Sequence, residues 1–192
     1  MKKGLLIVFS GPSGVGKGTV IKELMKRDEL NLVYSISMTT RKAREGEVDG
    51  VNYFFVSEEE FKEAIANQDL LEYANFVGNY YGTPKKYVEQ QRALGKNVLL
   101  EIETVGAKKV LDICKDDPGC LSIFILPPSI EELERRIRGR QTENEETILK
   151  RVAKARLELQ ETKYYKHQVT NVLVEDAVNE VAEIILKASE EL

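Results

Sequence analysis

The sequence predicts an α/β fold in which a parallel sheet carries helices on both faces. Short apolar runs alternate with amphipathic segments, a glycine-rich turn follows the first run, and two polar stretches interrupt the alternation. Continuous apolar runs are typical of strands buried on both faces, and their alternation with helices is typical of a parallel sheet. We therefore expect one core that carries a small mixed insert and a short lid.

Each expected element has its own signal in the sequence. The apolar runs that predict core strands are Leu5–Phe9, Val98–Leu100, Ile123–Leu126 and Val169–Val174. Segments with helical periodicity cover 19–29, 84–94, 105–115, 129–139, 143–163 and 177–190. Capping-box spacing at Ser57…Glu60, Ser129…Glu132 and Thr142…Glu145 marks helix starts, and Thr83-Pro84 places a cap residue before a proline.

Two stretches depart from this alternation. Residues 38–83 contain the short strand-like runs Asn52–Val56 and Leu70–Val77 between polar loops, which predicts a mixed insert. Residues 138–146 are charged and have little apolar surface to bury, which is typical of a mobile lid. The remaining residues, 1–37, 84–137 and 147–192, form the expected core.

Composition and charge narrow the function classes. The 192 residues are 42% hydrophobic and 31% charged, with a net charge of -4. A protein that holds a nucleic-acid backbone usually has a basic excess, so we expect no nucleic-acid partner. The apolar run Leu5–Phe9 is too short to span a bilayer, and Gly11–Gly14 interrupts it too early for a signal peptide, so we expect no membrane partner.

The few cysteines and the single histidine are also informative. Cys114 and Cys120 are too few for a disulfide framework or a zinc site, so we expect free thiols and a cytoplasmic location. The single histidine, His167, excludes a catalytic triad that uses histidine.

The glycine-rich turn has the pattern and the context of a phosphate-binding loop, or P-loop. It follows a buried strand and precedes an amphipathic helix, and its residues are Gly11, Pro12, Ser13, Gly14, Val15, Gly16, Lys17, Gly18 and Thr19. Glycines let backbone N–H groups converge on an anion, the helix N-terminus adds positive charge, and Lys17 adds a full charge. We expect ATP here; the alternative is a strand-to-helix turn without a ligand.

One position departs from the usual loop pattern. Gly18 stands where a hydroxyl that binds magnesium is expected, and Thr19 follows one residue later. One helical step rotates a side chain by about 100°. We therefore expect no certain protein ligand for Mg²⁺, which would come with ATP and lie near Thr19 and Glu101, held through water.

An arginine-containing segment predicts a second phosphate site. Arg41 and Arg44 lie three residues apart among hydroxyl side chains, after a short expected strand. Planar guanidinium groups bind phosphate in a bidentate manner. Taken alone, such a segment is also compatible with a solvated basic loop.

With its neighbours, this segment resembles the guanylate kinase family. The resemblance covers essentially the whole chain in order, through Ser37–Gly50, Tyr53–Val56, Leu71–Ala74, Gly78–Pro84, Pro127–Ser129 and Arg136–Glu143. It implies transfer of the γ-phosphoryl group of ATP to GMP, and also to dGMP, as part of purine nucleotide metabolism.

The resemblance also implies roles for residues of the insert. The residues that match the family's clamp on the GMP phosphate are Arg41, Arg44, Tyr53 and Tyr81. Those that match its guanine readers are Ser37, Glu72 and Thr83. A carboxylate such as Glu72 can accept hydrogen bonds from guanine N1–H and the 2-amino group together, and adenine offers no such edge. The tyrosines are also compatible with packing inside the insert, and Thr83 with capping the next helix.

The strand that ends at Glu101 and Glu103 matches the family's acidic strand. The family usually has aspartate and then glutamine where this chain has Glu103 and Val105. Contact with GMP, contact with water on magnesium, and a plain polar strand end all stay open for Glu103.

The resemblance extends to the expected lid. Arg136, Arg140 and Arg151 match arginines that the family brings onto the ATP phosphates, although surface ion pairs are the alternative for each. Gln141 stands where glycine is usual. Val174–Asp176 matches a segment near the adenine, with Glu175 where the family tends to have asparagine.

These roles predict direct in-line transfer without a covalent intermediate. GMP is already ionised at neutral pH, so no protein base is needed. The residues expected to compensate charge in the transition state are Lys17, Arg41, Arg136, Arg140 and Arg151. A guanylate-kinase-like module that binds peptides and a phosphokinase acting on a ribosyl bisphosphate are the alternatives. The sequence is compatible with a monomer or a homo-oligomer.

Overall fold

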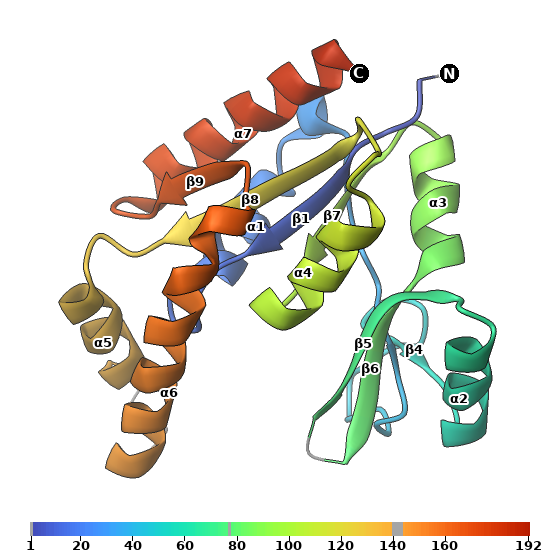
Figure 1. Cartoon of the computed structure of the whole chain (residues 1–192), viewed down its shortest axis with the longest axis horizontal. Coiled ribbons are helices and arrows are strands. Elements are labelled where there is room, and N and C mark those ends of the chain that lie inside the picture. The colour runs from blue at the N-terminus through green and yellow to red at the C-terminus, as the bar shows by residue number, and fades with distance from the viewer. Residues whose placement is uncertain (1, 77, 140–143) are drawn as a thin grey trace.

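The computed structural model describes residues 2–76, 78–139 and 144–192, and it has the expected α/β fold (Figure 1). A five-stranded sheet forms the centre of the core, and every neighbouring pair of strands is parallel. In spatial order its strands are β2 (Leu32–Tyr34), β7 (Asn97–Glu101), β1 (Leu6–Ser10), β8 (Cys120–Leu126) and β9 (His167–Thr170).

Helices cover both faces of this sheet because successive strand residues point to opposite sides. Ile7 and Phe9 of β1 belong to one buried cluster, and Leu6 and Val8 belong to the other. The helices in the first cluster are α1 (Lys17–Leu24), α5 (Ile130–Arg138), α6 (Glu145–Glu158) and α7 (Val174–Glu191). Those in the second are α3 (Lys85–Ala93) and α4 (Thr104–Ile113).

The insert forms a second, mixed sheet, which lies below α3 and to the right of α4 in Figure 1. Its spatial order is β4 (Phe54–Phe55), β3 (Met38–Thr39), β6 (Asn79–Pro84) and β5 (Leu70–Phe76). The pair β3 and β4 is parallel, whereas β6 pairs antiparallel with β3 and β5. Helix α2 (Glu58–Ala66) buries Phe61 against this sheet, with its ring 5.2 Å from that of Tyr80. The capping box expected at Ser57 is present.

Two expected element boundaries in the core are wrong. Helix α1 ends at Leu24 instead of continuing to Glu29, and a 3₁₀ turn, η1 (Asp28–Leu30), follows it. The last strand is β9, His167–Thr170, and the expected strand 169–174 overlaps the start of α7. Asn171 follows the strand directly, and its side-chain amide donates to the carbonyl of Val15, 2.8 Å away.

Helix α6 also starts differently from the expectation. Its N-cap is Asn144, whose Oδ1 accepts from the backbone N–H of Thr147 at 2.9 Å. After Glu158 the chain tightens into a 3₁₀ segment, η2 (Leu159–Tyr164). The expected cap residue Thr142 and the middle of the expected lid lie within 140–143, outside the described residues.

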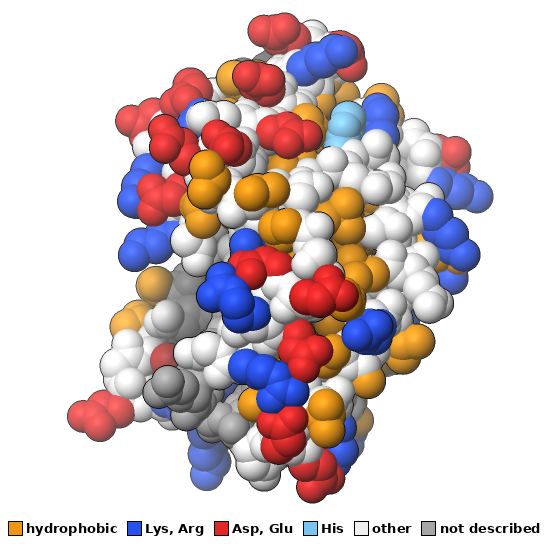
Figure 2. Space-filling model, turned by 90° about the vertical axis from the view of Figure 1, so that its left-hand side faces the viewer, with side chains coloured by type: hydrophobic (Ala, Val, Ile, Leu, Met, Phe, Trp, Pro, Cys, Tyr) orange, Lys and Arg blue, Asp and Glu red, His pale blue; other side chains and the backbone are white. Residues whose placement is uncertain are grey.

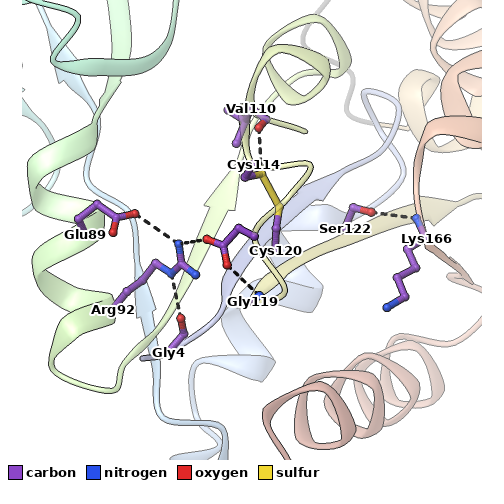
Figure 3. Close-up of a disulfide and its surroundings, with 10 residues drawn as sticks. Gly4, Glu89, Arg92, Val110, Cys114, Gly119, Cys120, Ser122 and Lys166 are labelled. Carbon is purple, nitrogen blue, oxygen red and sulfur yellow. Dashed lines mark hydrogen bonds and ion pairs between the residues drawn. A yellow bond between two sulfur atoms is a disulfide. The ribbon is translucent and has the colours of Figure 1, made fainter. Parts of the chain in front are cut away.

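The expectation of free thiols is wrong for this structure, which joins Cys114 and Cys120 in a disulfide (Figure 3). The two Cα atoms are 6.2 Å apart because a turn brings the end of α4 back to the start of β8. In that turn Asp117 accepts from the N–H groups of Gly119 and Cys120, at 2.8 and 2.9 Å. Nothing in the local spacing of the two cysteines distinguishes this pairing from two free thiols.

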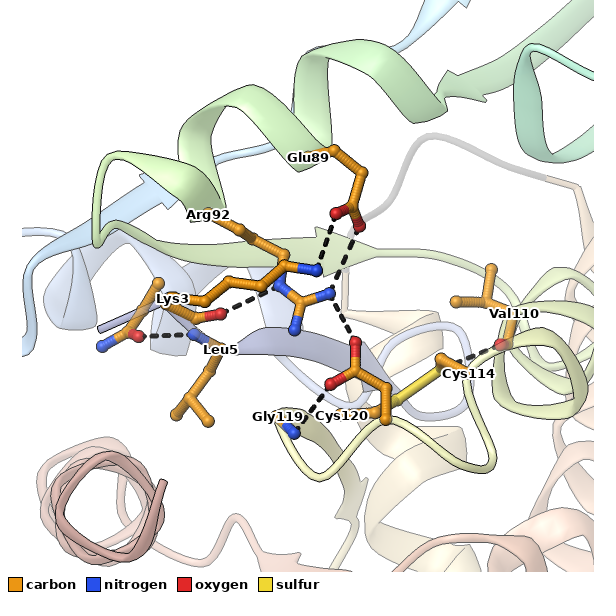
Figure 4. Close-up of polar contacts among 11 residues, drawn as sticks. Lys3, Leu5, Glu89, Arg92, Val110, Cys114, Gly119 and Cys120 are labelled. Atoms are coloured by element: carbon orange, nitrogen blue, oxygen red, sulfur yellow. Dashed lines mark hydrogen bonds and ion pairs between the residues drawn. A yellow bond between two sulfur atoms is a disulfide. The ribbon is translucent and has the colours of Figure 1, made fainter. Parts of the chain in front are cut away.

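Arg92 ties α3 to the same turn (Figure 4). It is 1% exposed, and its Nη1 donates to Asp117 at 2.7 Å while its Nε donates to the carbonyl of Gly4 at 2.9 Å. The guanidinium lowers the pKa of the Asp117 carboxyl. A buried charge is costly unless it is paired, so this contact explains how the fold accommodates Arg92.

The surface carries charges of both signs. On the face drawn in Figure 2, acidic and basic side chains are interspersed with apolar ones. Among the described residues, no helix is long and apolar enough to cross a membrane.

Candidate active site

The loop between β1 and α1 has the backbone of an anion-binding loop. Gly11, Gly14 and Gly16 have φ values of 148°, 88° and 98°, a region that residues with a Cβ rarely adopt. A Cβ at Gly16 would lie 2.7 Å from Nδ2 of Asn171, so this position also lacks space for a side chain. Gly16 leads directly into the first turn of α1, which directs the helix N-terminus at the loop.

Lys17 lies folded over this loop. Its Nζ donates to the carbonyl oxygens of Gly11 at 2.6 Å and Pro12 at 3.2 Å. Burial lowers the pKa of Lys17, while the carboxylates of Glu101 and Glu158 act in the opposite direction. The ammonium group therefore lies at the mouth of the loop, bound to carbonyl oxygens that a phosphate group can replace.

Arg136 and Asn171 hold the loop from the side of α5 and β9. Arg136 donates to the carbonyl of Val15 at 3.3 Å and to that of Asn171 at 3.1 Å. It also forms a 2.8 Å ion pair with Glu132, which is the alternative that the sequence left open, and its contact with ATP stays a prediction. The Asn171 side chain is 2% exposed. The sequence prediction missed Asn171, because it placed this residue inside the expected strand 169–174, whereas β9 ends at Thr170.

Helix α6 contacts the loop at Ser13. Arg151 Nη2 donates to Ser13 Oγ at 2.7 Å, and the Ser13 N–H donates to the Glu158 carboxylate at 3.2 Å. The sequence prediction missed Glu158, since a glutamate on a predicted helix gives no sign that it is buried. The third expected arginine, Arg140, lies outside the described residues.

The two glutamates at the end of β7 have different partners. Glu101 accepts from the Tyr34 hydroxyl at 3.1 Å, and burial together with this carboxylate raises the pKa of Tyr34. Glu103 is mostly exposed and forms a 3.0 Å ion pair with Lys154. Among the described residues there is no cluster of three or more His, Cys, Asp or Glu side chains that could hold a metal ion.

The segment expected near the adenine lies at the start of α7. Val174 and Glu175 line a cavity of about 550 Å³ together with Thr19 and Arg27 of the α1 region. Thr19 lines this cavity and lies two residues after Lys17 on α1, one helical step beyond Gly18.

A larger cavity of about 660 Å³ lies between the insert and the core. It brings together five of the expected acceptor-site residues, namely Ser37, Tyr53, Glu72, Tyr81 and Glu103. Glu101 and Gly106 line the same cavity from the core side. The acceptor-site residues therefore face the carboxyl end of β7, and β7 pairs directly with β1, which leads into the phosphate loop.

Glu72 is fixed inside this cavity. Thr83 Oγ1 donates to Glu72 Oε1 at 2.7 Å. Burial raises the pKa of Glu72, while the Thr83 hydrogen bond and the charge of Lys109 lower it. Thr83 is not the cap of α3, because Pro84 occupies that position. The hydroxyl instead orients the carboxylate and leaves Oε2 for other donors.

Arg41 is held at the edge of the insert by Glu47. Its two terminal nitrogens donate to the two carboxylate oxygens at 2.8 and 2.9 Å. The Arg41 side chain and the backbone N–H of Arg44 lower the pKa of Glu47 to about 2. The guanidinium also lies 5.3 Å from the ring centre of Tyr53, whose ring is 6.0 Å from that of Tyr81. Three expected clamp residues are thus adjacent, and the exposed Arg44 lies on the same loop.

Comparisons with known proteins agree on one family. The sequence profile described as "Guanylate kinase" matches residues 3–188. A curated guanylate kinase from Bacillus cereus is 52% identical over 96% of this chain and 89% of that protein. A guanylate kinase from Mycoplasma mycoides is 56% identical over 96% of this chain, and the chain spans 61% of the length of that relative.

The solved structures give the same match. The crystal structure of guanylate kinase from Anaplasma phagocytophilum superimposes with a TM-score of 0.74 and 34% sequence identity. The match covers 98% of this chain and 87% of that one.

Proposed function

The chain belongs to the guanylate kinase family, and we propose that it transfers the γ-phosphoryl group of ATP to GMP, giving ADP and GDP. The observation that carries the proposal is the buried Glu72 carboxylate, oriented by Thr83 in a cavity that opens toward the carboxyl end of the core sheet. Guanine offers two adjacent donors to such a carboxylate. Adenine offers an unprotonated N1 in their place, and AMP would leave the buried carboxylate unpaired.

The phosphate loop supports ATP as the donor. Backbone N–H groups, the α1 N-terminus and Lys17 converge where an anion would lie. Lys17 exchanges its contacts to Gly11 and Pro12 for phosphate oxygens when the nucleotide binds. Arg136 and Arg151 already touch the loop from α5 and α6, so short side-chain movements bring them onto the phosphates. Arg140 is proposed as a third contact from the lid.

The insert supports a nucleoside monophosphate as the acceptor. Arg41, Tyr53 and Tyr81 form a cationic and hydroxyl-bearing edge for its phosphate, with Arg44 beside them. Ser37, directly before β3, lines the cavity. dGMP carries the same base and phosphate, so we propose it as a second acceptor.

Catalysis comes from positioning of the two substrates and from compensation of charge on the transferred phosphoryl group. The acceptor phosphate is already ionised, so its oxygen attacks the γ-phosphorus directly, and no proton needs to be removed. Lys17 and the arginines balance charge on the equatorial oxygens, and the closed cleft excludes water.

We propose that Mg²⁺ accompanies ATP. The described residues hold no ready cluster of metal ligands, so the chain fits an ion carried by the triphosphate and contacted through water near Glu101 and Thr19. When bound, magnesium neutralises charge on the β- and γ-phosphate oxygens.

The substrates point to the cytoplasm, where ATP and GMP are available. Nucleic acid and membrane form no part of the proposed function.

One assay separates this enzyme from a peptide-binding module with the same fold. The protein is incubated with ATP, magnesium and GMP, and the nucleotides are separated by chromatography. The proposal predicts ADP and GDP in equal amounts, with neither formed when GMP is omitted. A protein that binds GMP but forms no GDP would contradict it.

A further inference from the structure

A buried carboxylate at the end of α6 contacts the phosphate loop. Glu158 is 6% exposed, and its Oε2 accepts the backbone N–H of Ser13 at 3.2 Å. Backbone N–H groups of such a loop are the donors that phosphate oxygens use. One of these donors is therefore occupied by an anion that belongs to the protein itself.

Helix α6 brings Glu158 to this position. Arg151 and Glu158 are seven residues apart, close to two helical turns, so they lie on the same face of the helix. Both reach Ser13, Arg151 through the hydroxyl at 2.7 Å and Glu158 through the backbone N–H. In Figure 1, α6 packs along the core beside β8 and β9 at its C-terminal end. One helix thus supplies two polar side chains to the same residue of the loop.

The charge of Glu158 is only partly balanced. Lys154 Nζ lies 3.7 Å from Glu158 Oε1 and is closer, at 3.0 Å, to Glu103. The charge of Glu158 also acts on Lys17 at the mouth of the loop. A neutral glutamine could accept the same hydrogen bond without the cost of a buried charge. The hydrogen bond to Ser13 therefore does not by itself explain why a charged side chain occupies this position.

We propose that Glu158 is a positioning residue that acts as an internal anion. It holds the Ser13 N–H while the loop is empty, and it opposes the phosphates when they enter. Binding of the triphosphate releases Glu158 from Ser13 and displaces the end of α6. The identity of the ligand as ATP rests on the proposed function. The competition between the Glu158 carboxylate and a phosphate group for the Ser13 N–H does not rest on it.

The test uses Glu158→Gln, which keeps the acceptor oxygen and the size of the side chain and removes the charge. The matched control is Glu161→Gln, because Glu161 lines the neighbouring groove with Glu158 but forms no hydrogen bond or ion pair with the loop among the described residues. The probe is inorganic tripolyphosphate, measured by titration calorimetry at low and at physiological ionic strength. Thermal unfolding checks that each variant is folded, and Glu158→Ala replaces Glu158→Gln if the latter does not fold.

We expect Glu158→Gln to bind tripolyphosphate about 3- to 10-fold more tightly than the wild type, with the larger gain at low salt. The control should stay within about twofold of the wild type. Unchanged or weaker binding by Glu158→Gln would overturn the proposal and leave Glu158 as a structural support of the loop. Because tripolyphosphate carries no base, this outcome is independent of whether GMP is the acceptor.

Discussion

The phosphate loop of the core and the acceptor pocket of the insert are built from different parts of the chain. In the loop, backbone N–H groups and a helix N-terminus form the proposed anion site, and three glycines allow that backbone. In the pocket, side chains form the proposed site. Thr83 orients Glu72, which we propose to read the base, and Arg41 lies with Tyr53 and Tyr81 where we propose that the acceptor phosphate binds.

The difference has a physical consequence. A site made of backbone recognises any group of the right charge and shape, because every residue carries the same N–H. A site made of side chains can match one pattern of donors and acceptors. We therefore assign phosphate affinity to the core and choice of acceptor to the insert.

The first prediction tests the one side chain on which the loop depends most. Lys17→Ala should lower kcat by about 10²-fold or more, because it removes a full charge from the transition state. Lys22→Ala, an exposed lysine on the same helix, is the control and should change little. A folded Lys17→Ala protein with near-normal turnover would contradict the assignment of the loop.

The second prediction concerns a substitution that changes the acceptor pocket and leaves the phosphate loop unchanged. Glu72→Gln should lower kcat/KM for GMP by about 10- to 100-fold, since one of two acceptors becomes a donor. Discrimination against AMP should relax, while ATP affinity stays unchanged. The measurement is steady-state kinetics with each acceptor, and Glu63→Gln on α2 is the control. An unchanged ratio of GMP to AMP would remove Glu72 as a reader of guanine.

The third prediction concerns the contact between helix α4 of the core and Glu72 of the acceptor pocket. A Cβ at Gly106 of α4 would lie 3.0 Å from Glu72 Oε2. Gly106→Ala should therefore raise KM for GMP by about 3- to 10-fold. It should also stabilise the fold by up to about 1 kcal/mol, because alanine favours helix over glycine. A lower melting temperature together with an unchanged KM would show that the crowding does not act on Glu72.

The smallest expected effect concerns the pH dependence of stability, through an ion pair within the insert. The pKa of Glu47 falls from 4.5 to about 2 in the fold, so its contribution to stability is fully present above 4.5. That contribution is lost as the pH falls from 4.5 toward 2. Glu47→Gln should remove this part of the pH dependence. The check is thermal unfolding of both proteins between pH 2 and 6; parallel curves would contradict the ion pair with Arg41.

The sequence predicted the phosphate loop better than the acceptor pocket, because backbone sites follow from local sequence and side-chain sites do not. Gly11–Gly18 is a continuous segment with a strand before it and a helix after it, so local rules suffice. The pocket joins residues from β5, β6, β7 and α4 with loop residues next to β3 and β4, and its members could be named only through the family resemblance. Thr83 illustrates the limit: its position suggested a helix cap, and its partner Glu72 is a neighbour only across the β5–β6 pair.

The missed residues were those whose role depends on burial. Glu158 and Asn171 are polar in sequence and buried in the fold, where they meet the loop through Ser13 and Val15. The disulfide was missed because the turn at Asp117, rather than the cysteine spacing, brings the two sulfurs together.

The most direct test of the account is the ratio of kcat/KM for GMP to that for AMP in the wild-type protein, with ATP and magnesium fixed. A carboxylate that reads two guanine donors, in a pocket separate from the phosphate loop, predicts a ratio of about 10⁴ or more. A ratio within about tenfold of one would mean that the pocket does not read the base. That result would contradict the division of the site into a phosphate-binding core and a base-selecting insert.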